Sequence, residues 1–274
     1  MVYKDKDEIL AAFNAFREQF DAVNDKRERL IKSSREVTIQ SKRIIFLLHR
    51  LVTSDSQDDQ AIEAAEKKLN HIRTTLLSEI HKEVPTPDEF WLHLRSISPG
   101  IQEYLEAVSY VHFLKTKGLI TYQEALLWFS DDSKIPFFPL PYDEFLLGIS
   151  DVTGELMRLA ITSIARGGGR ERASAICDFV RRCSADFEQF TPDVRELSKK
   201  QAVTKQSIRK IEEGESCAMR TKIFLLTSCK ANYAVHLRRA EFEDDPTMLD
   251  EYVRRSLSSR GRDIDDYAGG EEGD

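Results

Sequence analysis

Glycine and proline are scarce in this chain of 274 residues, with 12 and 8 copies, and many of them stand at breaks between long uninterrupted segments. Both residues disfavour the interior of a helix, so their scarcity favours a chain built mostly of helices. A hydrophobic content of 41% is enough for a sizeable core in a folded globular protein. The composition therefore predicts an all-α fold.

Long apolar runs are also missing. The most apolar stretch, "IIFLLHRLV", is too short and too charged to cross a bilayer. The N-terminus, "MVYKDKDEIL", does not resemble a signal peptide. The four cysteines show neither a CxxC pair nor a zinc spacing: Cys177, Cys183, Cys217 and Cys229. We therefore expect an intracellular protein with reduced thiols and no membrane role.

Most motifs of catalytic chemistry are absent. The loop "RGGGR" lacks the Lys-Ser/Thr of a phosphate-binding loop and follows a predicted helix instead of a strand. Nucleophile elbows, HExxH and dinucleotide fingerprints do not occur, and no histidine pairs with a cysteine or carboxylate at metal spacing. These absences leave clustered acidic residues as the catalytic candidates.

The net charge of −7 is concentrated at one end of the chain. Residues 241–274 hold 12 acidic residues against 4 arginines, which leaves residues 1–240 close to neutral. The final stretch, "DIDDYAGGEEGD", reads as a solvated tail that cannot bury enough apolar surface to fold. We therefore predict a single helical domain over 1–240 and an acidic tail over 241–274.

Apolar residues recur at helical spacing along most of the domain. This pattern predicts one long helix from about Asp5 to Val52 and a second from Ala61 to about Ile80. Ser98 and Pro99, as N-cap and first-turn residues, predict the start of a third helix.

The rest of the domain shows the same periodicity, separated by turn signals. It predicts a short helix capped by Thr121, a helix from Tyr142 to about Ala165, another over 171–190 and a long one that begins at Thr191 and Pro192. About seven helices in one antiparallel bundle, some of them long, is the expected architecture. Helices of that length extend beyond a small core and usually pack against another subunit.

Two pairs of carboxylates occupy faces that do not look fully solvated. Glu103 and Glu106 lie three apart, and their face continues through Tyr110 and Phe113. In the later helix Asp151 and Glu155 lie four apart, with leucines at both ends of their line. Like charges at this spacing repel each other unless a cation lies between them. The helix carrying the second pair also holds two glycines, which suggests close packing.

If the two helices meet, their acids form an all-oxygen cluster suited to Mg²⁺ or Mn²⁺. Such a site usually serves phosphate transfer or phosphodiester hydrolysis, with the metal activating water. Spacing alone leaves a second interpretation open, in which Glu155 pairs with Arg158, Glu103 faces water and nothing binds.

A basic stripe follows the first helix, because Arg35, Lys42 and His49 repeat every seven residues. It is either a solvated face or a track for the phosphates of a bound polyanion. His112 could reach a substrate near Glu106 or could be structural. These four residues are the candidates for binding such a polyanion.

Three stretches resemble the translin family, and in particular its translin-associated factor X branch. They are "KSSREVTIQSKRIIFLLHR", "GIQEYLEAVSYVHFLKTKGLIT" and "YDEFLLGISDVTGELMRLAITSI", in the family's order and at suitable separations. The resemblance covers roughly residues 5 to 219. Translin itself has mainly apolar residues at the positions of Glu103, Glu106 and Asp151, so these acids indicate the factor X branch.

The resemblance implies a seven-helix fold and a hollow hetero-oligomer with translin, expected to be octameric, that encloses RNA. It implies a Mg²⁺-dependent endoribonuclease site at Glu103, Glu106 and Asp151, with Glu155 as a fourth acid. The implied substrates are single-stranded, either nicked passenger strands of small RNA duplexes or pre-tRNA 5′ leader fragments. A non-catalytic RNA-binding or assembly subunit is the alternative.

Two departures from the family affect the expectations. Some members begin with a basic nuclear-targeting stretch, which "MVYKDKDE" lacks, so nuclear import by a signal of its own is not expected. The expected location is the cytoplasm, with the nucleus as a second possibility. Past about Met219 the chain no longer follows the family closely.

Overall fold

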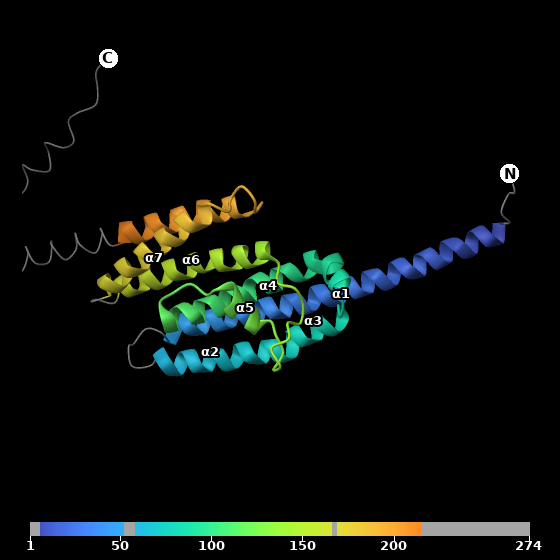
Figure 1. The fold of residues 1–274 in the computed structure, drawn as a ribbon, viewed down its shortest axis with the longest axis horizontal. Helices are drawn as coiled ribbons and strands as arrows, with labels where there is room; N and C mark the ends of the chain where they lie inside the picture. Colours follow the sequence, from blue (N-terminus) through green and yellow to red (C-terminus); the bar gives the residue numbers. More distant parts are fainter. Residues whose placement is uncertain (1–5, 52–57, 166–168, 215–274) are drawn as a thin grey trace, which may run out of the picture. The chain divides into compact units, whose positions relative to one another are not determined.

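The computed structural model describes residues 6–51, 58–165 and 169–214. Within these ranges the regular structure is helical and no strand forms, apart from one isolated bridge between Ser130 and Pro136 (Figure 1). The predicted all-α fold is therefore confirmed. No described helix is long and apolar enough to cross a membrane.

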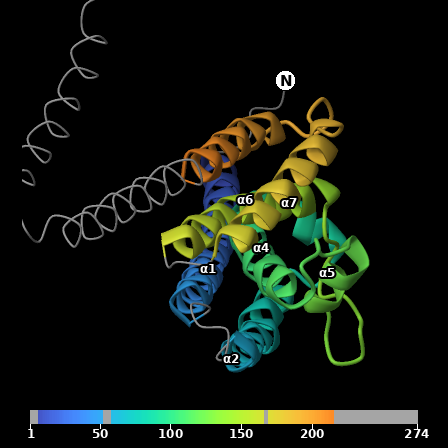
Figure 2. The same ribbon diagram turned by 90° about the vertical axis from the view of Figure 1, so that its left-hand side faces the viewer.

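Three long helices form the centre of the bundle: α1 (Lys6–Leu51), α4 (Pro87–Thr116) and α6 (Tyr142–Ala165). Helix α4 packs against α1 on one side and against α6 on the other, and most of its residues between Ile101 and Leu114 are buried (Figure 2). Apolar residues point in most directions around the central part of α4, and this explains its position, because a helix that is apolar on most faces must be enclosed by others.

The remaining elements cover this centre. Helix α2 (Asp58–Ile72), a π-helical turn η1 (Arg73–Leu77) and α3 (Ser78–Glu83) follow one another without a break and pack on α1. They correspond to the single helix predicted over 61–80. The short α5 (Tyr122–Trp128) begins with the predicted cap, since Thr121 and Glu124 form a reciprocal capping box. Helix α7 (Arg170–Glu188) packs on α6.

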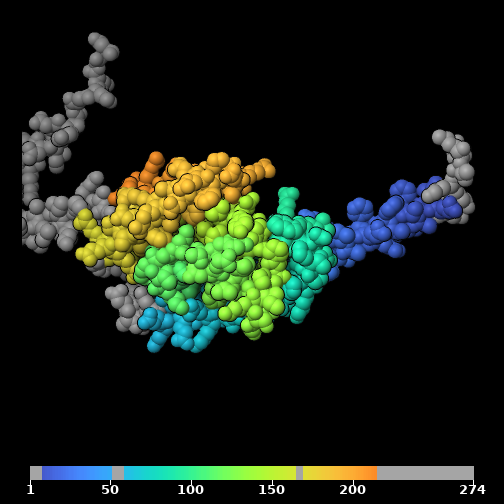
Figure 3. All heavy atoms as spheres, in the orientation of Figure 1, coloured from blue at the N-terminus to red at the C-terminus, as the bar shows by residue number. Residues whose placement is uncertain are grey.

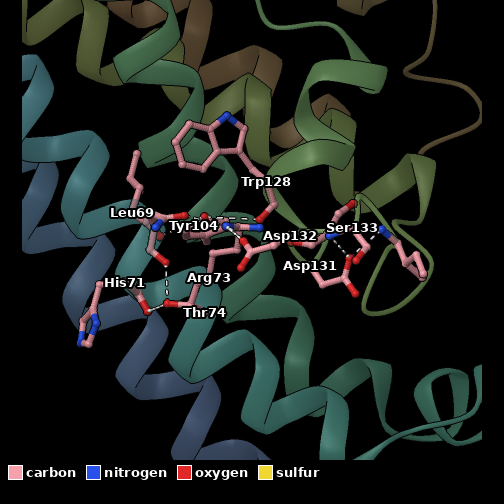
Figure 4. Close-up of polar contacts among 12 residues, drawn as sticks. Leu69, His71, Arg73, Thr74, Tyr104, Trp128, Asp131, Asp132 and Ser133 are labelled. Atoms are coloured by element: carbon pink, nitrogen blue, oxygen red, sulfur yellow. Dashed lines mark hydrogen bonds and ion pairs between the residues drawn. The ribbon is translucent and has the colours of Figure 1, made fainter.

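The π-helical turn is tied to the centre of the bundle by side-chain hydrogen bonds (Figure 4). The buried Tyr104 hydroxyl donates to the Leu69 carbonyl at 3.2 Å, one turn before η1. Arg73, the first residue of η1, donates to the Ser130 carbonyl at 2.6 Å and to Asp132 at 2.7 Å. A π turn interrupts the regular backbone ladder, and these side chains fix it against the loop that follows α5.

The predicted helix start at Ser98 and Pro99 is wrong. Helix α4 begins at Pro87, and Thr86 is its N-cap, whose side chain accepts a hydrogen bond from the Glu89 amide. Pro99 lies inside the helix. Ser98 caps nothing and donates instead to Glu144 on α6 at 2.6 Å.

A contact with α1 explains why proline is tolerated inside α4. Proline lacks an amide hydrogen, and its ring crowds the preceding turn. The Ser34 hydroxyl of α1 bonds the backbone on either side of Pro99, since it donates to the Ile97 carbonyl at 3.1 Å and accepts from the Gly100 amide at 3.0 Å. A Cβ atom at Gly100 would lie 2.8 Å from the Ser34 carbonyl oxygen, so glycine permits this close approach.

The predicted N-cap at Thr191 is also wrong. Residues 191–196 form turns, and the last described helix covers residues 197–214. Thr191 belongs to the end of α7, where its hydroxyl donates to the Glu188 carbonyl at 2.8 Å. The amides of Asp193 and Val194 both donate to the Phe190 carbonyl, which closes a turn before a helix can start.

Helices α4 and α6 approach closely at Gly148. A Cβ atom there would lie 2.8 Å from Cδ2 of Leu105 and 3.1 Å from the Gln102 carbonyl. The prediction that glycine serves close packing is therefore confirmed for Gly148. It is wrong for Gly154, where an added Cβ would meet no atom within 4 Å.

The N-terminal half of α1 lies apart from the other described helices (Figures 1 and 3). Residues 8–25 are all exposed, although they carry large apolar side chains at heptad-like spacing. The apolar stripe of α1 consists of Ile9, Phe13, Phe16, Phe20 and Val23, each between 44% and 74% exposed. This stripe is a helix face without an intramolecular neighbour among the described residues.

Several predictions concern residues that lie outside the described ranges. They include the acidic tail over 241–274, the end of the predicted domain at 240 and most of the "RGGGR" loop. Cys217 and Cys229 lie there too. Cys177 and Cys183 are buried thiols of α7, as predicted, and burial raises the pKa of Cys183 to about 11.

Candidate metal centre

The four predicted carboxylates line one cavity of about 400 Å³. Glu103 and Glu106 come from α4, and Asp151 and Glu155 come from α6. The other lining residues are Lys42, Ile45 and Phe46 from α1 and Arg158 from α6. The two acid pairs, separated by more than forty residues in the sequence, therefore face the same space.

The packing at Gly148 explains why the acids converge. Gly148 sits against Leu105, which lies between Glu103 and Glu106 in the sequence. Asp151 follows Gly148 by about one helical turn, and Glu155 follows by a second. Close contact of the two helices at this level brings both acid pairs to the same side of the packed interface.

Burial and mutual repulsion keep part of the cluster protonated. Glu106 is only 9% exposed, and desolvation, followed by the nearby Glu103, Asp151 and Glu155, raises its pKa to about 9. Desolvation also raises the pKa of Glu103, against the opposing effect of Lys42. A cation bound among these carboxyl groups would offset their repulsion and burial, and would therefore stabilise their ionised form.

Three of the four acids contact basic side chains. Lys42 lies 3.3 Å from Glu103, and Arg158 donates to Glu155 at 2.9 Å. Asp151 forms a short contact with Lys200, which belongs to the last described helix. The expectation that Glu155 pairs with Arg158 is met, while Glu103 turns toward the cavity instead of facing open water.

A histidine joins the cluster from α1. The Nε2 atom of His49 lies 2.6 Å from Oε2 of Glu155, and its Nδ1 atom lies 3.3 Å from the Tyr110 hydroxyl. The rings of His49 and Tyr110 are in contact, with centroids 5.1 Å apart. The predicted RNA-binding residue His49 is therefore engaged with the acidic cavity.

The donor set fits a hard divalent cation. Four carboxylates supply oxygen ligands only, which is the chemistry that Mg²⁺ and Mn²⁺ prefer. Within the described residues, no three His, Cys, Asp or Glu side chains are gathered around a single point. Lys42, Lys200 and Arg158 hold three of the acids in their present rotamers. Binding of an ion would therefore require these side chains to move.

Two other predicted RNA-binding residues, Arg35 and His112, do not line the cavity. Arg35 is exposed on α1, two turns before Lys42, so the predicted stripe runs along one face toward the cavity. His112 contributes to the lowered pKa of Glu124, after the hydrogen bonds from Thr121, so it lies on the side of α4 that faces α5.

Three residues near the cavity were not predicted: Lys200, Tyr110 as a partner of His49, and Phe46. Lys200 is placed by the contact of the last described helix with α6, where the Thr153 and Thr204 hydroxyls lie 2.9 Å apart. Its sequence context, "SKKQ", gives no signal of this contact. The position of Phe46 could have been predicted from the sequence, because helical spacing places this apolar residue one turn after Lys42, on the exposed side of the helix.

Comparison with known proteins identifies the family. The Translin family matches residues 25–214. The chain is 35% identical over 224 residues to "Translin-associated protein X" of Rattus norvegicus, with 74% of this chain and 76% of that protein covered. It is 31% identical over 209 residues to the "Translin-associated protein X homolog" of Schizosaccharomyces pombe, with 73% and 84% covered. The chain belongs to the Translin family, as the sequence motifs indicated.

Solved structures agree on the fold. The protein of "Crystal structure of AfC3PO" superimposes with a TM-score of 0.53 at 21% identity, covering 77% of this chain and 99% of that one. The protein of "Structure of AfC3PO - duplex RNA complex" gives a TM-score of 0.51 at 19% identity, with 77% and 98% covered. The helical arrangement described above is thus that of a translin-type protein.

Proposed function

We propose that this protein is the catalytic subunit of a hetero-oligomer with translin and hydrolyses phosphodiester bonds of single-stranded RNA with the help of Mg²⁺. One observation carries the proposal: four carboxylates from two helices line the same cavity, beside Arg158 from one of them and Lys42 from a third. Mn²⁺ could substitute for Mg²⁺, since both accept oxygen ligands.

Each acid has a role in this proposal. Glu103, Glu106 and Asp151 would hold the ion, and Glu155 would complete or orient the shell. When bound, the ion would activate water and stabilise the charge that develops on the phosphodiester. Ionisation of Glu106 would accompany binding, because a cation replaces the proton that burial now favours.

The basic residues would hold the RNA backbone. Lys42 and Arg158 are more than half exposed at the cavity and could turn from their acids to phosphates. Arg35 lies on the same face of α1 as Lys42 and extends the track. His112 faces α5, so in this proposal it would contact only RNA that wraps around α4.

The exposed Phe46 supports a single-stranded substrate. Its side chain is 63% exposed although it is aromatic, and it lines the cavity next to Lys42. An exposed ring beside a basic groove is what a protein uses to stack an unpaired base, and a base inside a duplex is not available for such stacking. Nicked passenger strands and pre-tRNA 5′ leader fragments are the substrates we propose.

The apolar stripe of α1 supports assembly with a partner. An isolated helix with five large exposed apolar residues gains little stability by itself in water, and a second helix would bury them. We propose translin as that partner in an octameric assembly. The matched relatives carry the name of a translin-associated protein, and one structural neighbour is described in complex with duplex RNA. We propose that the protein works in the cytoplasm and can also be nuclear.

A second candidate function is a non-catalytic assembly or RNA-binding subunit. The ion pairs of Glu103, Asp151 and Glu155 with basic side chains favour it, because they neutralise the cluster without a metal. In that case the acids would be structural charges inside the bundle.

The two functions are separated by cleavage assays on the complex reconstituted with translin. The Glu103→Ala/Asp151→Ala variant should lose Mg²⁺-dependent cleavage of an end-labelled single-stranded RNA by at least about 100-fold, with assembly and RNA binding intact. A matched control replaces two exposed acids outside the cavity, Glu63 and Asp178. Cleavage by the cavity variant at the rate of the control would establish the non-catalytic function.

A further inference from the structure

His49 lies where the three central helices meet. It is close to the C-terminal end of α1 and contacts Glu155 on α6 and Tyr110 on α4. Only 16% of its side chain and 11% of that of Glu155 are exposed. A histidine that served only to attract phosphates would keep its ring in solvent, as Lys42 does with its side chain, which is 54% exposed.

The distances indicate which atoms donate and which accept in the hydrogen bonds that join Tyr110, His49 and Glu155. A carboxylate oxygen 2.6 Å from Nε2 accepts a hydrogen bond from that nitrogen, so Nε2 carries the hydrogen in this arrangement. In the tautomer with its hydrogen on Nε2, Nδ1 is the acceptor, and the Tyr110 hydroxyl would then donate to it. Tyr110 thereby fixes both the tautomer and the orientation of the ring.

These contacts hold the Glu155 carboxylate in one orientation. One oxygen, Oε2, is held by His49, and Oε1 is held by Arg158 at 2.9 Å. Arg158 is 58% exposed and can move away, whereas His49 is enclosed and its ring lies against that of Tyr110 at a tilt of 31°. If Arg158 turns to RNA, Oε1 becomes available at the cavity while Oε2 keeps its hydrogen bond.

We infer that His49 is a positioning residue of the metal centre, which holds Glu155 in the orientation that ligates a divalent cation, with Tyr110 behind it. This inference rests on the proposed function and assigns His49 to the metal centre instead of the RNA track. Hydrogen-bond partners behind a metal ligand typically change metal affinity or activity 10- to 100-fold when they are removed.

The test measures metal affinity directly, in the full-length chain assembled with translin. Free Mn²⁺ is followed by electron paramagnetic resonance during titration of the complex, and cleavage of single-stranded RNA is followed in parallel. His49→Ala should weaken Mn²⁺ binding at least about 10-fold. His49→Gln, whose amide nitrogen can replace Nε2, should restore affinity to within a few-fold of the wild type. The KM for RNA should stay unchanged in both.

Two further variants complete the design. Tyr110→Phe removes the hydroxyl and keeps the ring, so it should weaken Mn²⁺ binding several-fold, and it carries the test if His49→Ala does not assemble. His71→Gln, an exposed histidine of α2, is the matched control and should bind as the wild type does.

The outcomes distinguish this inference from the proposed function. Wild-type affinity in both His49→Ala and Tyr110→Phe, or a raised KM for RNA with unchanged Mn²⁺ affinity, would overturn the positioning role and leave the nuclease proposal standing. A wild-type complex that binds Mn²⁺ through this cavity but cuts no RNA would overturn only the proposed activity. A wild-type complex that binds no Mn²⁺ would overturn both.

Discussion

Gly148 of α6 packs directly against Leu105 of α4, so closely that a single added Cβ would lie 2.8 Å from the leucine side chain. This contact sets the distance between the two helices that carry the four carboxylates. The same α6 helix contains Gly154, where an added Cβ meets nothing within 4 Å. Substitution of Gly148 therefore tests close packing at the site, and the same substitution of Gly154 tests helix propensity alone.

Gly148→Ala should lower the free energy of unfolding by about 1 to 3 kcal/mol, because overpacking forces α4 and α6 apart. Gly154→Ala should be neutral or should raise it by up to about 1 kcal/mol, since alanine favours a helix more than glycine does. Urea denaturation followed by circular dichroism measures both. Equal effects of the two substitutions would show that the close approach at Gly148 does not control packing.

The protonation of Glu106 predicts how stability changes with pH. Its pKa is about 9 in the folded protein and near 4.5 in the unfolded chain. Between these values the folded state holds a proton that the unfolded state has lost, so stability falls as pH rises, by at most about 1.4 kcal/mol per pH unit. Glu106→Gln should therefore be more stable than the wild type at pH 8 and similar to it at pH 4.

Thermal unfolding at several pH values, without divalent ions, measures this difference. Glu171→Gln, at an exposed acid of α7, is the control and should leave the pH profile unchanged. Added Mg²⁺ should stabilise the wild type most at the alkaline end, where it no longer competes with the proton. A pH profile of Glu106→Gln that parallels the wild type would contradict the protonated, buried state of this acid.

The exposed ring of Phe46 predicts a loss of RNA binding when it is removed. Stacking of one base on an aromatic side chain contributes roughly 1 to 3 kcal/mol. Phe46→Ala should therefore raise the KM for single-stranded RNA about 5-fold or more, and Phe46→Trp should preserve it. Phe190→Ala, at another exposed phenylalanine outside the cavity, is the control. Disruption of assembly without a change in KM would instead identify Phe46 as a subunit contact.

The apolar stripe of α1 predicts where the partner binds. Burial of one phenylalanine side chain is worth about 1.5 to 3 kcal/mol, so Phe13→Ser/Phe20→Ser should dissociate the complex with translin. Asn14→Ser/Glu18→Ser changes the opposite face of the same turns and should leave assembly intact. Size-exclusion chromatography with light scattering on co-expressed chains measures the assembly. Full assembly of the phenylalanine variant would exclude the stripe as the interface.

The sequence alone predicted the helical elements that depend on local signals. The cap of α5 at Thr121 and the limits of α1 and α6 follow from capping residues and periodicity, which act within a few residues. The start of α4 could not be predicted, because Ser98 and Pro99 carry the local signal of a helix start, while the Ser34 hydroxyl that bonds the backbone on either side of Pro99 lies 65 positions earlier in the chain. No local pattern reports such a contact.

The acidic residues of the candidate site could be predicted, but their environment could not. Flanking aromatics, flanking leucines and like-charge spacing mark Glu103, Glu106, Asp151 and Glu155 as candidates, but periodicity does not show that their two helices meet. Lys200 and the place of His49 depend on how distant helices are rotated against α6, which periodicity leaves undetermined. The apolar residues in the first half of α1 have the heptad spacing of a buried helix face. Their side chains are nevertheless exposed in the single chain, and sequence spacing does not report this difference.

The central claim, that the four carboxylates bind the catalytic ion, is tested most directly by locating that ion. Crystals of the complex with translin, soaked in Mn²⁺, give an anomalous diffraction signal at each bound metal. We predict a peak within about 2.5 Å of oxygens from Glu103, Glu106 and Asp151, lost in the Asp151→Ala variant. A complex that cleaves RNA with Mn²⁺ but shows its metal peak elsewhere, and none in this cavity, would contradict the account.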